Sequence, residues 1–174
     1  MTKSPALVIA AAAALVAVAV QPAVAEPRST IALDQVIAFD NPSDPWLSES
    51  SDRIFKSVWN KASTQLAVPG VGLTKVSTST ADNGWVANDV PIRGDWHGLR
   101  MTGFSLNGVP QSGVGAYVLH FADAPGEVVR TLDAIGFPVA AVGRETRTGD
   151  ESCGAKLRVD KDGLGSAFTI SFAC

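Results

Sequence analysis

The segment CGAKLRVDKDGLGSAFTISFAC, residues 153–174, decides the fold of this chain. Polar and apolar residues alternate over residues 156–159 and again over residues 168–172, as they do in strands that bury one face. Asp162-Gly163 and Gly165 lie between these two stretches, and such residues favour turns. The segment therefore predicts an antiparallel β-hairpin at the C-terminus.

The hairpin also predicts a disulfide between Cys153 and Cys174. Folding the segment about its middle places Leu157 opposite Ile170, and the same register places the two cysteines opposite each other. Directly opposed residues lie about 4.5–5.5 Å apart, a separation that a disulfide can bridge. The alternative is a pair of unrelated buried thiols. Close Cys-x-x-Cys spacing is missing from the sequence, so we expect a structural bond and not a redox centre.

Residues 1–25 have the layout of a secretory signal peptide. Lys3 supplies the positive charge, residues 6–20 form an apolar run, and Ala23-Val24-Ala25 is a small-x-small cleavage motif. The alternative is an uncleaved membrane anchor, but a span needs about 20 apolar residues and this run is shorter. We therefore expect residues 26–174 to be exported to the periplasm or the exterior as a single domain without a membrane span.

Composition excludes one class of function. The chain has 174 residues, with 14 Lys+Arg and 17 Asp+Glu, and a net charge of −3. Binding to nucleic acid depends on a basic surface, so we expect no nucleic-acid partner.

The remaining punctuation predicts about two helices. Residues 48–66 carry a helical stripe that includes Trp59 and Leu66, with Ser48 or Ser51 as the cap and Pro69-Gly70 as the end. A second helix is expected after Asp123, read as its N-cap, and before Gly136.

Most other segments indicate strands. Strand patterns cover residues 73–76, 85–86, 99–106, 115–121 and 139–142. Gly103 interrupts one of them and suggests a bulge. Residues 31–39 fit a strand or a short helix, and residues 144–150 read as a charged loop. Together with the hairpin, this order predicts an α+β fold with a mostly antiparallel sheet.

Three tryptophans are the main candidates for a binding surface. Trp46, Trp85 and Trp96 all stand among prolines, glycines and polar residues and not on a clean core stripe. Exposed aromatic residues are frequent in surfaces that bind partners. The alternative is that each tryptophan fills a small core beneath a loop.

The catalytic candidates are weaker. Asp95 and His97 lie two residues apart between glycines, and His120 is the other histidine. An acid/base pair or half of a metal site is one interpretation, but the three or four spaced ligands of a metal site are missing. We expect neither a metal nor a cofactor, and read these residues as loop or packing residues by default.

Taken together, the sequence favours a small exported protein that acts by binding. An inhibitor, an immunity-type module or an envelope-associated protein fits, with an envelope protein or a glycan as the partner. The alternatives are an envelope hydrolase that uses Asp95 and His97, and a purely structural secreted protein.

Overall fold

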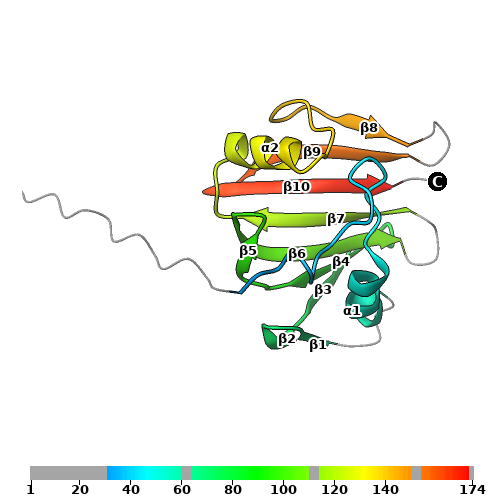
Figure 1. Ribbon diagram of the computed structural model, residues 1–174. Coiled ribbons are helices and arrows are strands. Elements are labelled where there is room, and N and C mark those ends of the chain that lie inside the picture. Colours follow the sequence, from blue (N-terminus) through cyan, green and yellow to red (C-terminus); the bar gives the residue numbers. More distant parts are fainter. Residues whose placement is uncertain (1–30, 60–63, 110–113, 150–153, 173–174) are drawn as a thin grey trace, which may run out of the picture.

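A computed structural model describes residues 31–59, 64–109, 114–149 and 154–172 (Figure 1). In this part of the chain the fold is α+β, with two helices and a mostly antiparallel sheet, as predicted. The helices are α1 (Glu49–Trp59) and α2 (Pro125–Ala134). The strands are β1 (Gln65–Val68), β2 (Gly72–Lys75), β3 (Ser77–Thr80), β4 (Val86–Val90), β5 (Gly94–Trp96), β6 (Leu99–Val109), β7 (Val114–Phe121), β8 (Thr146–Thr148), β9 (Ala155–Asp162) and β10 (Gly165–Phe172).

The main sheet has the strand order β3-β4-β6-β7-β10-β9-β8, and every pairing in it is antiparallel. β1 and β2 form a separate hairpin. β4 and β5 both pair with β6, one after the other along its length. Pro91 lies between them, where it interrupts the strand because it has no N–H to donate to a ladder.

The C-terminal hairpin is confirmed in its register. β9 and β10 pair Leu157 with Ile170, as the alternation predicts. Gly163 has φ 56° at the first position of the two-residue turn, a conformation that glycine adopts without steric cost. Cys153 and Cys174 lie outside the described residues, so the disulfide stays a prediction.

The strand pair before α2 is also confirmed. β6 and β7 pair along most of their length, and the register shifts between Met101 and Gly103. This irregularity is the bulge expected from Gly103, and it lies beside His120, the cross-strand partner of that glycine.

The first helix is shorter than predicted. Ser48 caps it, because its Oγ accepts the Ser51 N–H at 3.3 Å. The predicted extension to Leu66 is wrong: that residue is in β1, and Pro69-Gly70 forms the turn to β2 and does not end the helix. Leu66 satisfied the helical stripe, but it also alternates with Val68, and the pairing with β2 selects the strand.

The cap predicted for the second helix is wrong as well. Ala124 is the N-cap residue of α2 and makes no side-chain cap. The Asp123 carboxylate instead accepts the Arg100 backbone N–H and the Arg100 Nε–H, the latter at 2.9 Å. A charged donor on the neighbouring strand gives the carboxylate a stronger partner than a helix N–H. The end at Gly136, with φ 95°, is as predicted.

Three further segments differ from the expectation. Residues 139–142 are not a strand, because Gly143 turns the chain with φ 75° and leaves Val142 46% exposed. The edge of the main sheet beside β9 is formed by β8, which lies inside the segment predicted as a charged loop. Residues 31–39 are neither strand nor helix. They turn over the sheet and make two isolated bridges, a parallel one from Ala32 to Asp95 and an antiparallel one from Phe39 to Leu47.

The core lies between one face of the sheet and a layer formed by α1, α2 and residues 31–48 (Figure 1). Alternate residues of β6, β7, β9 and β10 point into this layer, among them Phe104, Leu119, Leu157 and Phe168. Their neighbours point to the opposite side, which we call the open face. No helix among the described residues is long and apolar enough to cross a membrane.

Candidate functional site

Trp96 belongs to the core and not to a binding surface. Its side chain is fully buried, and its indole Nε1–H donates to the Ile37 carbonyl at 2.7 Å. Residues 31–48 cover the Trp96 side chain. This packing joins segments far apart in the chain, so the polar residues next to Trp96 in the sequence do not indicate it. For Trp96 the structure therefore shows the alternative interpretation, a tryptophan that fills the core beneath a loop.

Trp46 lies apart from the other candidates. It is 41% exposed, and its ring stacks on Phe172 with centroids 3.9 Å apart and an interplanar angle of 18°. Phe172 points to the core side of the sheet, so Trp46 covers the end of β10 from that side. The predicted tryptophans do not form one surface.

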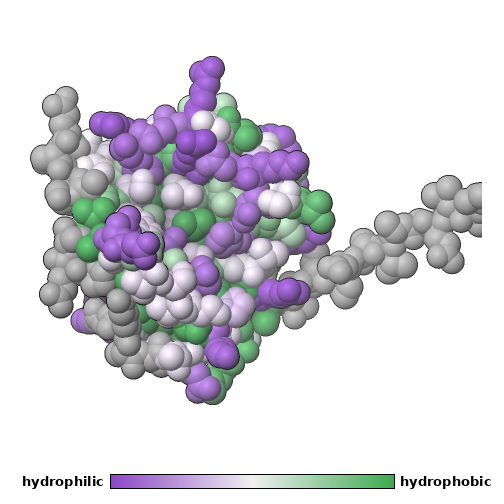
Figure 2. All heavy atoms as spheres, turned by 180° about the vertical axis from the view of Figure 1, so that it is seen from behind, coloured by the Kyte–Doolittle hydropathy of each residue, from purple (hydrophilic) through white to green (hydrophobic). Residues whose placement is uncertain are grey.

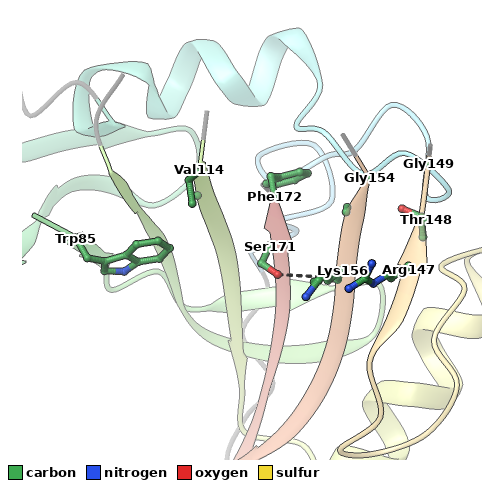
Figure 3. A pocket seen from close by; sticks show the side chains of 11 residues that line it. Trp85, Val114, Arg147, Thr148, Gly149, Gly154, Lys156, Ser171 and Phe172 are labelled. Atoms are coloured by element: carbon green, nitrogen blue, oxygen red, sulfur yellow. Dashed lines mark hydrogen bonds between the residues drawn. The ribbon is translucent and has the colours of Figure 1, made fainter. Parts of the chain in front are cut away.

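Trp85 is the predicted tryptophan that borders a hollow at one end of the strands of the main sheet. The turn between β3 and β4 holds it in place: Asn83 Oδ1 accepts the Trp85 backbone N–H at 3.1 Å, and Gly84 takes φ 80°. The half-buried indole lies along the wall of a hollow of about 760 Å³ (Figure 3). Cavities of this size commonly hold small-molecule ligands.

Two cations lie at the other side of this hollow. Arg147 of β8 and Lys156 of β9 are direct cross-strand partners, and both line the hollow. Figure 3 shows their side chains lying next to each other, with Ser171 between them and Trp85. Between the indole and the cations the floor consists of small residues, including Gly115 and Ser171.

Glu145 partly compensates the two cations. Its Oε1 lies 3.3 Å from Lys156 Nζ and 3.7 Å from Arg147 Nε. Like charges placed directly opposite in a ladder destabilise it, and one carboxylate shared between two cations leaves a positive excess. An aromatic wall, a polar floor and a cationic end are suited to an anionic ligand with a flat or apolar part.

A second, smaller hollow of about 440 Å³ lies where β4, β6 and β7 meet the end of β9. Ser105, Asp89, His120 and Asp162 line it and form a chain of hydrogen bonds. Of these four residues, only His120 is among the candidates predicted from the sequence. Only the strand order brings these residues together, and no short motif contains them.

Asp95 and His97 serve the turn between β5 and β6. His97 has φ 51° and Gly98 has φ 84°, both positive as in a type I′ turn. Asp95 Oδ1 accepts the Gly98 N–H at 2.9 Å, and Asp34 Oδ1 accepts the His97 N–H at 2.6 Å. Neither Asp95 nor His97 lines the two hollows described above, and His120 lies in the second of them. The geometry gives the hydrolase hypothesis built on Asp95 and His97 no support.

In the part of the chain that the structure describes, no three His, Cys, Asp or Glu side chains form a group that could hold a metal ion.

Figure 2 shows the molecule from behind the view of Figure 1, where hydrophilic and intermediate residues make up most of the surface. Both hollows are lined mainly by the strands of the main sheet, with the basic one at the side of β8 and β9 and the other beside β4. The main sheet thus borders two chemically different hollows.

Comparison with known proteins adds no assignment to these sites: no family model matches the chain, and no similar curated protein or solved structure was found.

Proposed function

We propose that this chain is an exported binding protein whose ligand is an acidic oligosaccharide held in the Trp85 hollow. The observation that carries the proposal is the placement of Arg147 and Lys156 as direct cross-strand partners in a hollow whose other wall is Trp85. The proposed site therefore contains one of the three predicted tryptophans, Trp85, together with two cations that are not among the residues predicted from the sequence.

The charge of the ligand follows from the cation pair. A charged residue on a short edge strand protects that edge from pairing with other chains, and Arg147 alone serves that purpose. Protection gives no reason to place a second cation directly opposite. Functional sites commonly contain arrangements that lower local stability, and here a pair of cations that can bind an anion weakens the pairing of β8 with β9.

The length of the ligand follows from the sheet. β6, β7 and β10 separate β4 from β9, and neighbouring strands lie about 4.8 Å apart. The indole reaches over part of this distance, but a ligand that contacts both ends is longer than a single small anion. A sugar chain has this length, and its rings present C–H faces that pack on an aromatic side chain.

Export and the disulfide are part of the same proposal. The signal-like residues 1–25 support export to a compartment where disulfides persist and where acidic glycans are accessible. A bond between Cys153 and Cys174 would close the strand ends beside Gly154 and Phe172, which line the hollow.

The test is calorimetric titration of the purified protein with oligogalacturonides, with neutral maltooligosaccharides of the same length as the comparison. We expect binding of the acidic series only, and weaker binding as salt is raised. Arg147→Thr and Trp85→Ala should each lower the affinity by about tenfold or more, because each removes one end of the site.

Arg130→Thr is the matched control, since Arg130 is exposed on α2 and lies on the covered side of the sheet. Equal affinity for the acidic and the neutral series would contradict the charge assignment. Absence of binding to either series, by a protein that is folded, would contradict the proposal and favour a protein partner for the open face.

A further inference from the structure

The second hollow holds a serine, a histidine and an aspartate in series. Ser105 Oγ lies 3.0 Å from His120 Nε2, and His120 Nδ1 lies 2.8 Å from Asp162 Oδ2. The three residues come from β6, β7 and the end of β9, and all three line the hollow. This is the connectivity of a nucleophile, a general base and an orienting carboxylate.

The local backbone explains how the ring reaches the serine. His120 pairs with Gly103, whereas Ser105 pairs with Val118, so the two side chains are diagonal neighbours across the ladder. Gly103 has no side chain, and a Cβ there would lie 3.7 Å from His120 Cδ2. The imidazole therefore lies over the glycine and leans toward Ser105.

A fourth residue determines where the serine proton lies. Asp89, the cross-strand partner of Ser105, accepts the Ser105 hydroxyl at 2.6 Å. A hydroxyl has one proton, and a carboxylate only accepts, so this proton is directed to Asp89 and not to His120. In this arrangement His120 Nε2 donates to Ser105 Oγ, and the serine is not activated.

Asp89 can leave this position, because it is exposed at the rim of the hollow, whereas Ser105 is 4% exposed at its base. We propose that Ser105, His120 and Asp162 form a latent acyl-transfer site for short-chain esters, which Asp89 holds inactive. The deep placement of Ser105 restricts the acyl group to a small one such as acetyl. This activity is separate from glycan binding and does not depend on it.

In the inactive arrangement Nε2 donates to Ser105 and Nδ1 donates to Asp162, so both ring nitrogens of His120 carry a proton. When Asp89 moves away, the Nε2 proton passes to water, which leaves neutral His120 with its proton on Nδ1. Ser105 then gives its proton to the free Nε2, and Oγ bonds to the ester carbonyl carbon. The C–O bond to the leaving alcohol then breaks, and that oxygen takes the proton from Nε2. Water, deprotonated by the same nitrogen, cleaves the acyl-serine to a carboxylic acid and restores the hydroxyl.

The test measures covalent labelling by a small fluorophosphonate, with the adduct located by mass spectrometry, and hydrolysis of p-nitrophenyl acetate. Asp89→Asn replaces the competing acceptor by an amide that can donate to Oγ. We expect it to label at Ser105 about 10²-fold faster than the wild type, in line with the usual contribution of a general base. The acetate ester should be hydrolysed faster in the same proportion.

Two further variants in the Asp89→Asn background identify the machinery. Ser105→Ala should remove the adduct, and His120→Gln should return the rate to that of the wild type or below. His97→Asn is the control histidine substitution, since asparagine tolerates the positive φ of that turn.

A folded Asp89→Asn protein that labels no faster than the wild type, or that carries the adduct elsewhere, overturns the proposal. Should that variant fail to fold, Asp89→Ala and prolonged labelling of the wild type take its place. No adduct at Ser105 in any folded protein overturns it equally.

Discussion

Arg147 and Lys156 stand directly opposite each other on β8 and β9, two cations paired across an antiparallel ladder. The Glu145 carboxylate touches both and is the acid that the structure places between them. Local stability and the proposed binding of an anion therefore make opposite demands on this edge of the sheet.

Removing one of these cations should separate the two demands. Arg147→Thr places a β-branched residue, which suits a strand, at this position and ends the repulsion, so the free energy of unfolding should change by less than about 0.5 kcal/mol, in either direction. Glu145→Gln should act the other way, with slightly lower stability and tighter binding of acidic oligosaccharides. Urea denaturation and calorimetry of the same samples measure both effects. Parallel losses of stability and binding in Arg147→Thr would mean that the arginine is structural.

High pH should destabilise the protein through Tyr117. Burial, together with the charge of Asp52, raises the pKa of Tyr117 from 10.0 to about 12. As the pH rises, the tyrosine ionises in the unfolded chain before it ionises in the folded protein. The contribution of neutral Tyr117 to the free energy of unfolding is therefore complete below pH 10 and is lost as the pH rises to about 12. The pKa shift corresponds to a loss of about 2–3 kcal/mol in the free energy of unfolding.

Tyr117→Phe should lose less stability than the wild type between pH 9 and about 12, which denaturant unfolding at each pH will show. If the free energy of unfolding falls equally steeply with pH in both proteins, Tyr117 does not cause the loss of stability.

The predicted disulfide can be tested by mass. The masses of the protein, produced with the export proposed above, should differ by two hydrogens before and after reduction, and alkylation without reductant should modify neither Cys153 nor Cys174. Reduction should lower the free energy of unfolding by about 2–4 kcal/mol. Alkylation of either cysteine in the unreduced, unfolded protein would contradict the bond.

Gly165 should tolerate no side chain. A Cβ at this position would lie 2.0 Å from the Phe121 carbonyl oxygen, a backbone atom that moves only if β7 and β10 separate. Gly165→Ala should therefore cost about 3 kcal/mol or more, or prevent folding. Gly126→Ala is the control, since Gly126 is in α2 and the nearest atom, in the Arg130 side chain, lies 3.9 Å away. The thermal unfolding midpoint of Gly165→Ala should lie clearly below that of Gly126→Ala. Equal midpoints would show that β7 and β10 can move apart with little loss of stability.

Alternation together with the turn was enough to predict the register of the C-terminal hairpin. Alternation keeps Leu157 and Ile170 on the same side, and the turn at Asp162-Gly163 excludes the two-residue shifts that alternation alone would allow. Ser48, Asp123 and Gly136 likewise located the helix ends to within a turn, although Asp123 is not the cap, and the exception is the end of the first helix, where Leu66 fits both a helical and a strand period. The alternation of a strand and the residues that begin or end a helix depend only on residues close together in the sequence, so they can be predicted without the tertiary structure.

The sites depend on what lies far apart in the chain. Trp96 has polar neighbours in sequence and yet is buried, because residues 31–48 fold over it. His120 and Asp162 are 42 residues apart, and Arg147 faces Lys156 only because β8 takes the edge beside β9. Sequence by itself determined the fold class and the pairing of its last two strands, since these follow from the period of the side chains. Only the tertiary structure decided which polar residues share a hollow, because strand order is set by packing of the whole sheet.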